Sequence, residues 1–128
     1  MEFQALGKRV TAPSKNLDTF PKPDGVTTVT FTSNELTSLC PVTEQPDFST
    51  VVIEYKPDQL CIESKSLKLY LWSFRNECAF CEALASTIAR AVFTATQPFA
   101  CRVVITQNVR GGISIQAEAE LKRDEQTA

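Results

Sequence analysis

The sequence predicts an α+β fold in which one antiparallel sheet carries two helices on one face. Three observations predict it: two consecutive helical stretches lie in the middle of the chain, two strand-like segments precede them, and two more follow. With 128 residues and 43% apolar composition, the chain is long enough for one domain with its own core. Two helices on one face of an antiparallel sheet are a common layered arrangement. We expect an N-terminal arm over residues 1–25, the domain over 26–121 and a frayed tail over 122–128.

The segments before the helices combine β-branched residues with proline. The arm has little periodicity and contains Pro13, Pro21, Pro23 and Gly25, which favour irregular backbone. Residues 26–32 are rich in valine and threonine and predict the first strand. Pro41 and Pro46 predict an irregular loop over 34–48, and residues 49–56 predict the second strand.

The two helices are predicted from apolar spacing. Residues 65–76 contain no β-branched residue, and Leu67, Tyr70, Leu71 and Phe74 recur at helical spacing, although the alternation over 67–69 also fits a strand. A second helix is predicted over 80–96, where Phe80, Leu84, Ile88 and Val92 form one apolar stripe.

Two further strands complete the ββααββ order. The first covers residues 101–107. The second covers 113–121 and has the clearest alternation in the chain, with apolar residues at odd positions and polar residues at even ones. The outer strands of such a sheet expose hydrogen-bonding edges unless another chain pairs with them.

Composition narrows the function classes. The formal charge of −2 argues against direct binding to nucleic acid or to a membrane surface, because such proteins usually carry a basic excess. No stretch approaches the ~20 apolar residues of a membrane span. Five cysteines without a recognisable export signal are typical of a reducing compartment, so we expect a cytoplasmic protein.

The sequence contains no histidine. Ser-His and Cys-His catalytic pairs are therefore excluded, as are histidine-ligated metals. Proton transfer near neutral pH must use a carboxylate, lysine, cysteine, tyrosine or water. A thiol paired with a carboxylate satisfies this restriction.

Cys40 and Asp47 form such a candidate pair, because they lie seven residues apart around a proline-bounded loop. A thiolate can attack an electrophilic carbon while a nearby carboxylate accepts and returns the proton. Taken alone, this spacing is more often that of a structural cysteine beside a turn.

Basic residues offer a candidate site for phosphates. Lys65 and Lys68 share one helical face, and Arg110 could join them around a dinucleotide. The sequence lacks a Gly-x-Gly-x-x-Gly after a strand, which excludes a Rossmann cofactor site. The alternatives are a solvated basic face for the lysines and a hairpin turn at Arg110-Gly111-Gly112.

Two carboxylates flank the predicted helices. Glu63 and Glu82 could each accept N–H donors from a ring edge. Taken alone, Glu82 is more typical of a first-turn acid favoured by the helix dipole. Between the helices, Cys78 and Cys81 form a Cys-x-x-Cys that could indicate zinc or dithiol chemistry. Zinc would require two more ligands without histidine, so we expect no metal.

Taken together and in order, five motifs resemble one enzyme family. They are Cys40–Phe48 (CPVTEQPDF), Glu63–Tyr70 (ESKSLKLY), Ser73–Glu77 (SFRNE), Phe80–Glu82 (FCE) and Arg110–Ser114 (RGGIS). The set covers residues 36–115 and resembles the NADPH-dependent 7-cyano-7-deazaguanine reductases, the nitrile reductases of queuosine biosynthesis, a tRNA modification.

The resemblance implies the tunnelling fold, in which the sheets of several subunits join into a barrel and bind purine-like rings between subunits. It implies that Cys40 adds to a nitrile to give a thioimide and that Asp47 manages protons. It implies a small deazapurine nitrile as the partner, bound by Ile62, Glu63, Ser64, Cys81 and Glu82, and NADPH bound by Lys65, Lys68 and Arg110. We expect a homo-oligomeric ring in which Glu82 and the Cys40 loop come from different chains.

Three positions depart from the family pattern. Cys81 stands where relatives commonly carry histidine or an aromatic residue, and Cys78 and Glu44 stand where glycine is usual. Two other functions compete with the reductase: an amidine-forming relative of the same fold that acts on a tRNA-borne base, and a non-catalytic ring-binding or dithiol protein.

Overall fold

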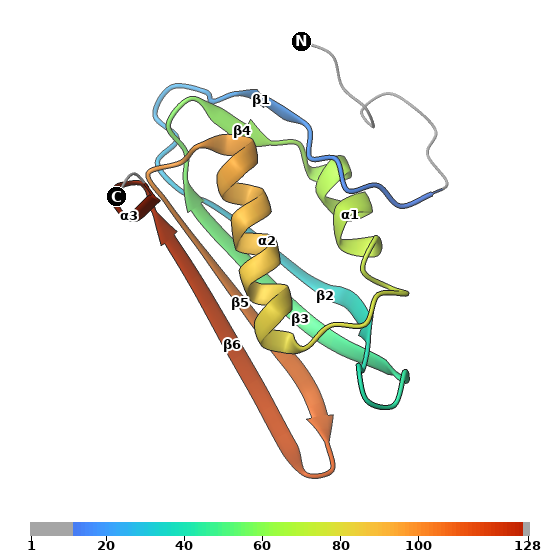
Figure 1. Ribbon diagram of the computed structural model, residues 1–128. Helices are drawn as coiled ribbons and strands as arrows, with labels where there is room; N and C mark the ends of the chain where they lie inside the picture. Colours follow the sequence, from blue (N-terminus) through green and yellow to red (C-terminus); the bar gives the residue numbers. More distant parts are fainter. Residues whose placement is uncertain (1–11, 127–128) are drawn as a thin grey trace.

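The computed structural model describes residues 12–126 (Figure 1). In chain order the elements are β1 (Thr19–Pro21), β2 (Val29–Leu39), β3 (Pro46–Lys56), β4 (Leu60–Ile62), α1 (Ser64–Trp72), α2 (Cys81–Thr96), β5 (Ala100–Arg110), β6 (Ile113–Lys122) and α3 (Arg123–Gln126).

The main sheet has four antiparallel strands in the order β2-β3-β5-β6. Figure 1 shows α1 and α2 on the same face of this sheet, with α2 lying across β5 and β6. The α+β class with two helices on one face is therefore confirmed. Strands β2 and β6 form the two edges of the sheet.

The core lies between α2 and the inward residues of the sheet. Ile88 and Val92 of α2 are fully buried against a layer that includes Ile53, Val103 and Ile105. The inward residues of β3, of β6 and of β5 as far as Gln107 have odd numbers, because side chains alternate between the faces of a strand. Burying such side chains stabilises the fold by roughly 1.5–3 kcal/mol each.

Strand β2, which corresponds to the strand predicted over 26–32, is longer than expected, and the irregular loop after it is shorter. We expected a loop over 34–48, but β2 continues to Leu39 and β3 begins at Pro46. The pairing of β2 with β3 shifts by one residue between Ser33 and Leu36, so the inward side changes from odd to even positions. This bulge interrupts the alternation that would have revealed the strand. Pro46 is tolerated because it is the first residue of its strand.

The arm also contains regular structure that we did not predict. Strand β1 pairs with β4 in a separate two-stranded sheet, and the N–H of Glu63 donates to the carbonyl of Asp18. Lys15 lies 3.5 Å from the centre of the Phe74 ring and 2.7 Å from a carboxylate oxygen of Glu77. The arm is thus fixed from about Lys15 onward, and the part of it that covers residues 1–11 lies outside the described residues.

The expected frayed tail is ordered over most of its length. Strand β6 includes Lys122, and the helical turn α3 follows it. The guanidinium of Arg123 lies 3.0 Å from Asp58 and packs over the Phe99 ring. Residues 127–128 of the expected tail lie outside the described residues.

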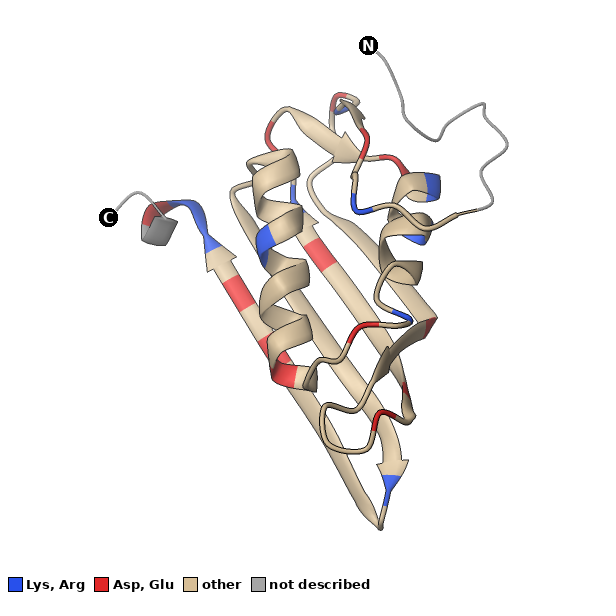
Figure 2. Cartoon of the chain, turned by 45° about the vertical axis from the view of Figure 1, so that its right-hand side comes forward, with Lys and Arg blue, Asp and Glu red and all other residues tan. Residues whose placement is uncertain are grey.

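Both predicted helices are present, with α1 ending at Trp72 rather than at residue 76. Leu67, Tyr70, Leu71 and Phe74 are all buried, as their spacing predicted. Acidic and basic residues are interspersed along the chain rather than gathered on one basic face (Figure 2). Among the described residues, no helix is both long and apolar enough to cross a membrane.

Candidate active site

Cys40 lies in the short turn that joins β2 to β3. Its N–H donates to the carbonyl of Gln45 at 2.8 Å, and its carbonyl accepts from the N–H of Glu44 at 2.8 Å. Leu39, just before it, pairs with Pro46 on one side and bridges to Cys78 on the other. These contacts hold a half-buried thiol at one end of the sheet.

The surroundings of Cys40 favour its thiolate. The side chain of Thr43, together with the backbone N–H groups of Thr43 and Val42, lowers the pKa of Cys40 to about 7. The positive charge of Arg110 lowers this pKa further, although its effect is smaller. A substantial fraction of Cys40 is therefore nucleophilic at neutral pH, which is uncommon for a cysteine without a histidine partner.

Asp47 is buried at the start of β3, on the inward face of the sheet. It forms an ion pair with the guanidinium of Arg110, the last residue of β5. The ion pair is made by its Oδ1 atom, which is shielded from solvent and has no other polar partner within residues 12–126. A buried carboxylate of this kind requires a positive charge or a bound donor beside it.

The N-terminus of α2 completes this end of the molecule. Cys81 is buried, and its thiol donates to the carbonyl of Ile105 at 3.6 Å. Burial and the nearby Glu82 carboxylate raise the pKa of Cys81, so this thiol stays protonated. Glu82 itself is exposed in the first turn of the helix.

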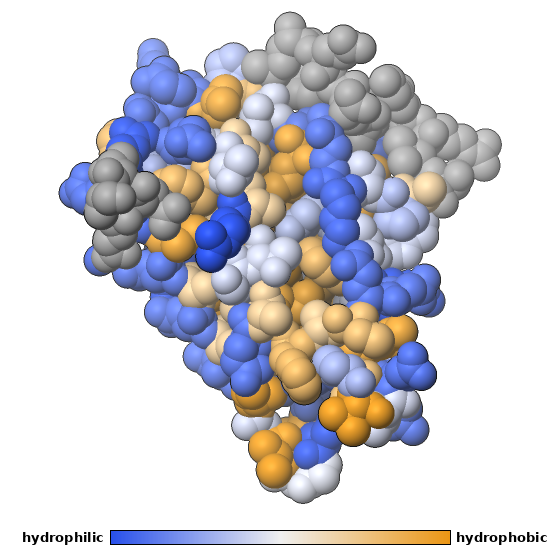
Figure 3. All heavy atoms as spheres, viewed as in Figure 1, coloured by the Kyte–Doolittle hydropathy of each residue, from blue (hydrophilic) through white to orange (hydrophobic). Residues whose placement is uncertain are grey.

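These residues surround one pocket of about 500 Å³, which we call the Cys40 pocket. Its lining includes Cys40, Asp47, Cys81, Glu82, Gln107 and Arg110. Phe80 and Ile113 of this lining are large, exposed apolar side chains, and Val42 and Val109 are exposed next to lining residues in the sequence. Figure 3 shows apolar surface gathered at this lower end of the molecule.

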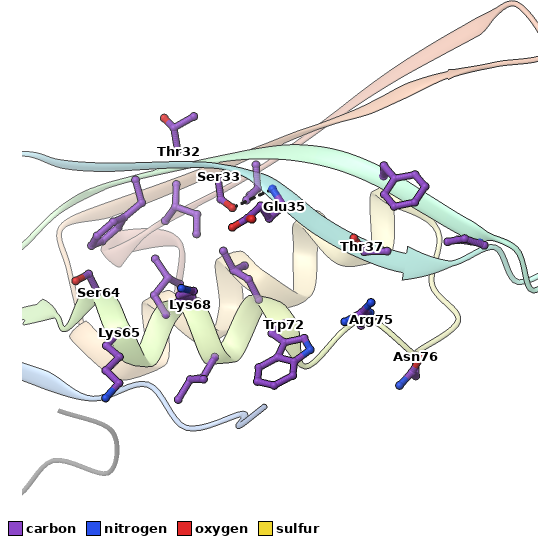
Figure 4. Close-up of a pocket in the computed structure, with 18 of the residues that line it drawn as sticks. Thr32, Ser33, Glu35, Thr37, Ser64, Lys65, Lys68, Trp72, Arg75 and Asn76 are labelled. Carbon is purple, nitrogen blue, oxygen red and sulfur yellow. Dashed lines mark hydrogen bonds between the residues drawn. The ribbon is translucent and has the colours of Figure 1, made fainter. Parts of the chain in front are cut away.

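A larger groove of about 1000 Å³ runs between α1 and the edge strand β2, and we call it the α1 groove. Figure 4 shows Ser64, Lys65, Lys68 and Trp72 along α1, and Thr32, Ser33, Glu35 and Thr37 along the neighbouring β2. Lys65 points away from β2, and Thr32 points away from α1. Arg75 and Asn76 extend the groove on the segment after the helix. The groove therefore combines three cations with three aromatic rings, those of Phe31, Phe48 and Trp72.

Ile62 and Glu63 lie just before α1 and are both buried. The N–H of Ile62 donates to the Tyr55 hydroxyl at 2.7 Å. The carboxylate of Glu63 caps α1 by accepting the N–H groups of Lys65 at 2.7 Å and Ser66 at 2.8 Å. Glu63 thus has a structural role at the helix N-terminus, where a negative charge is favoured.

The predicted site residues form two groups within one chain. Cys40, Asp47, Cys81, Glu82 and Arg110 surround the Cys40 pocket, whereas Ser64, Lys65 and Lys68 line the α1 groove. The expectation that Glu82 and the Cys40 loop come from different chains is therefore wrong, because both line the same pocket. The segment 62–64 lies near β4, at the opposite end of the sheet from the Cys40 turn (Figure 1).

Several contributors to the site were not singled out from the sequence. Thr43 supports the Cys40 thiolate, and a hydroxyl three residues after a cysteine in a proline-bounded turn is the signal that could have indicated it. Trp72 gave no signal of its own, because its spacing fits an ordinary helix, and Arg75 was noted only as part of the SFRNE motif, without a role.

The Cys-x-x-Cys motif does not form a paired site. All five cysteines are free thiols, with Cys78 exposed and Cys81 buried. No group of three potential metal ligands is found in the described part of the chain. Burial raises the pKa of Cys101 to about 12, so this thiol is also unreactive.

Residues 46–126 match the family model described as "QueF-like protein". The chain is 49% identical over 117 residues to the NADPH-dependent 7-cyano-7-deazaguanine reductase of Syntrophus aciditrophicus, covering 90% of this chain and 84% of that one. The chain belongs to the QueF-like family. Proteins of the same name from Nitratidesulfovibrio vulgaris (strain DP4) and Halorhodospira halophila are 42% and 47% identical, covering 92% and 86% of this chain and 76% and 95% of theirs.

A solved structure shares the fold. The crystal structure of the apo form of the archaeosine synthase QueF-Like superposes with a TM-score of 0.71 at 23% sequence identity, covering 76% of this chain and 95% of that one. The domain therefore has the tunnelling fold, as its resemblance to the family implied.

Proposed function

We propose that this QueF-like protein is an NADPH-dependent nitrile reductase that converts 7-cyano-7-deazaguanine to 7-aminomethyl-7-deazaguanine, in the biosynthesis of queuosine. One observation carries the proposal: an activated thiol, Cys40, and a buried carboxylate, Asp47, share a pocket in a chain that is 49% identical to a reductase of that name. Free thiols and a need for NADPH fit a reducing compartment such as the cytoplasm.

The Cys40 pocket accounts for activation of the nitrile. The thiol proton passes to Asp47, and the sulfur forms a bond to the nitrile carbon as one carbon–nitrogen π bond breaks. Asp47 returns the proton to the nitrogen, which gives a covalent thioimide. Glu82, exposed at the rim, is placed to accept N–H donors from the guanine-like edge of the ring, and Cys81 forms the buried wall beside it.

The α1 groove suits a dinucleotide. At about 1000 Å³ it has the size of a large ligand site, and Lys65 and Lys68 lie along it where phosphates need positive charge. When bound, NADPH supplies hydride for the reduction of the carbon–nitrogen bond, and two equivalents are required per nitrile. The protein has to orient the nicotinamide toward Cys40 and exclude water.

Assembly is part of the proposal, because the two groups of residues lie apart within one chain. Strands β2 and β6 leave their edges unpaired in the described chain, and apolar side chains are exposed around the Cys40 pocket. We infer a homo-oligomeric ring in which the segment 62–68 of one chain completes the Cys40 pocket of its neighbour. Ile62, Glu63 and Ser64 then line the ring site together with Cys81 and Glu82.

A complementation experiment tests the assembly. Mixing Cys40→Ala chains with Lys68→Ala chains should restore part of the reductase activity. At some interfaces the Lys68→Ala chain supplies an intact Cys40 pocket, and the Cys40→Ala chain supplies an intact segment 62–68. Mixing Cys40→Ala with Glu82→Ala should restore none, since both residues belong to the same pocket. A fully active monomer by light scattering would contradict the assembly.

NADPH oxidation that depends on added nitrile tests the function as a whole. The reductase should oxidise two NADPH per 7-cyano-7-deazaguanine and release the aminomethyl product. The amidine-forming alternative would consume ammonia without oxidising NADPH, and a non-catalytic ring-binding protein would do neither.

A further inference from the structure

Arg110 lies with the catalytic pair rather than with the lysines that we assign to the cofactor. We propose that Arg110 is a positioning residue that acts as the counter-ion of Asp47 and keeps it ionised, ready to accept the proton of Cys40. This inference rests on the proposed function, and it gives Arg110 a role in the Cys40 pocket in addition to the phosphate-binding role that the family resemblance implies.

The register of the β5–β6 hairpin brings Arg110 to the inward side. Pairing between these strands shifts by one residue between Gln107 and Arg110, so β5 carries one extra residue there. Such a bulge reverses the alternation, and an even-numbered residue then shares the face of the odd-numbered Gln107. Gly111 and Gly112 close the hairpin with φ angles of 58° and 76°, which residues with a Cβ rarely adopt. The turn thereby fixes the position of Arg110 just before it.

Two contacts fix the guanidinium. It forms an ion pair with Oδ1 of Asp47, and its Nη2 donates to Oε1 of Gln45 at 3.4 Å. Asp47 is buried, whereas the Arg110 side chain is 41% exposed. The arginine thus reaches from the rim to a shielded carboxylate oxygen that has no other polar partner in the described structure.

The chemistry requires an ionised Asp47 at the start of the reaction. A buried carboxylate without a counter-ion takes up a proton, and a protonated Asp47 cannot accept the proton of Cys40. The other titratable side chains lining the pocket are Cys40, Cys81 and Glu82, none of which is cationic. Among the residues of this pocket, Arg110 is therefore the group that can hold Asp47 in its basic form.

The pH dependence of adduct formation tests this role. Rates of thioimide formation from 7-cyano-7-deazaguanine, without NADPH, would be measured by intact-protein mass spectrometry across pH for wild type, Arg110→Gln and Arg110→Lys. In Arg110→Gln, the loss of rate at low pH should begin roughly one to three pH units higher than in wild type. This is the usual size of the effect when a carboxylate loses a neighbouring positive charge. Arg110→Lys should restore most of the wild-type profile, because lysine keeps the charge.

Two controls separate a positioning role from a loss of structure. Arg102→Gln removes another ion-paired arginine of β5, whose partner Glu118 is on β6, and should leave the profile unchanged. In an Asp47→Asn background, Arg110→Gln should cause no further loss of adduct rate, since the group that it serves is gone.

The proposal is wrong if Arg110→Gln loses adduct rate at the same low pH as wild type, whether or not NADPH binding changes. A further loss on Arg110→Gln in the Asp47→Asn background does so too. If wild type itself forms no adduct at any pH, the proposed function fails and the role of Arg110 fails with it.

Discussion

The N–H of Glu44 donates a hydrogen bond of 2.8 Å to the carbonyl oxygen of Cys40, and this bond closes the turn that carries the thiol. Glu44 adopts the left-handed region, with φ at 59°. This conformation costs a residue with a Cβ roughly 1–2 kcal/mol, and glycine avoids most of that cost. Glycine is therefore the residue that this position of the turn favours.

Glu44→Gly should therefore stabilise the protein. Relief of the backbone strain outweighs the roughly 0.5–1 kcal/mol that glycine loses through unfolded-state entropy, so a net gain of about 0.5–1 kcal/mol is expected. Urea unfolding measures the change. Glu44→Ala removes the same carboxylate but keeps the Cβ, and should not share the gain. Equal stability of the two variants would show that the turn stores no such strain.

Thr43→Val should make Cys40 less reactive at neutral pH. Loss of the hydroxyl removes the largest contribution that lowers the pKa of Cys40 to about 7, so this pKa rises and less thiolate is present at pH 7. Alkylation by iodoacetamide, followed by peptide mass spectrometry, should become several-fold slower at Cys40. The exposed Cys78 provides an internal reference for reagent activity. Thr30→Val, at an exposed position on β2, is the matched control; an unchanged Cys40 rate in Thr43→Val would contradict the assigned cause.

Lys65→Ala and Lys68→Ala should each weaken NADPH binding and leave adduct formation at Cys40 largely in place. Charge-assisted contacts contribute roughly 1.5–3 kcal/mol, which predicts a ten- to a hundredfold loss of affinity in a titration. Lys122→Ala, whose ion pair with Glu120 lies on β6, is a control that should bind NADPH normally. The division of roles is wrong if the α1 variants bind NADPH normally and lose the adduct.

The sequence predicted the elements whose periodicity extends over many residues. Helix α2 and strand β6 were found within a residue or so of their ends, because their apolar residues repeat without interruption. Strand β2 was cut short because its bulge changes the inward side between Ser33 and Leu36. Strands β1 and β4 were missed because three-residue strands carry no period, and their pairing depends on a contact across some forty residues.

In the candidate site, too, local features could be predicted from the sequence, and features that depend on distant contacts could not. That Cys40 and Asp47 line one pocket could be expected from the sequence, because the turn between them is local. The partner of Arg110 could not be predicted, since it depends on the bulge in β5 and on the pairing of β5 with β3. The placement of Glu82 beside Cys40 likewise depends on how α2 packs on the sheet, which no local pattern records.

The most direct test of the account is the mass of the protein after incubation with 7-cyano-7-deazaguanine and no NADPH. The account predicts one covalent adduct per chain, mapping to Cys40 and absent from Cys40→Ala, while Cys78→Ala still forms it. NADPH added afterwards should discharge the adduct and return the unmodified mass. An adduct that persists in Cys40→Ala, or that maps to Cys81, would contradict the central claim that Cys40 is the nucleophile.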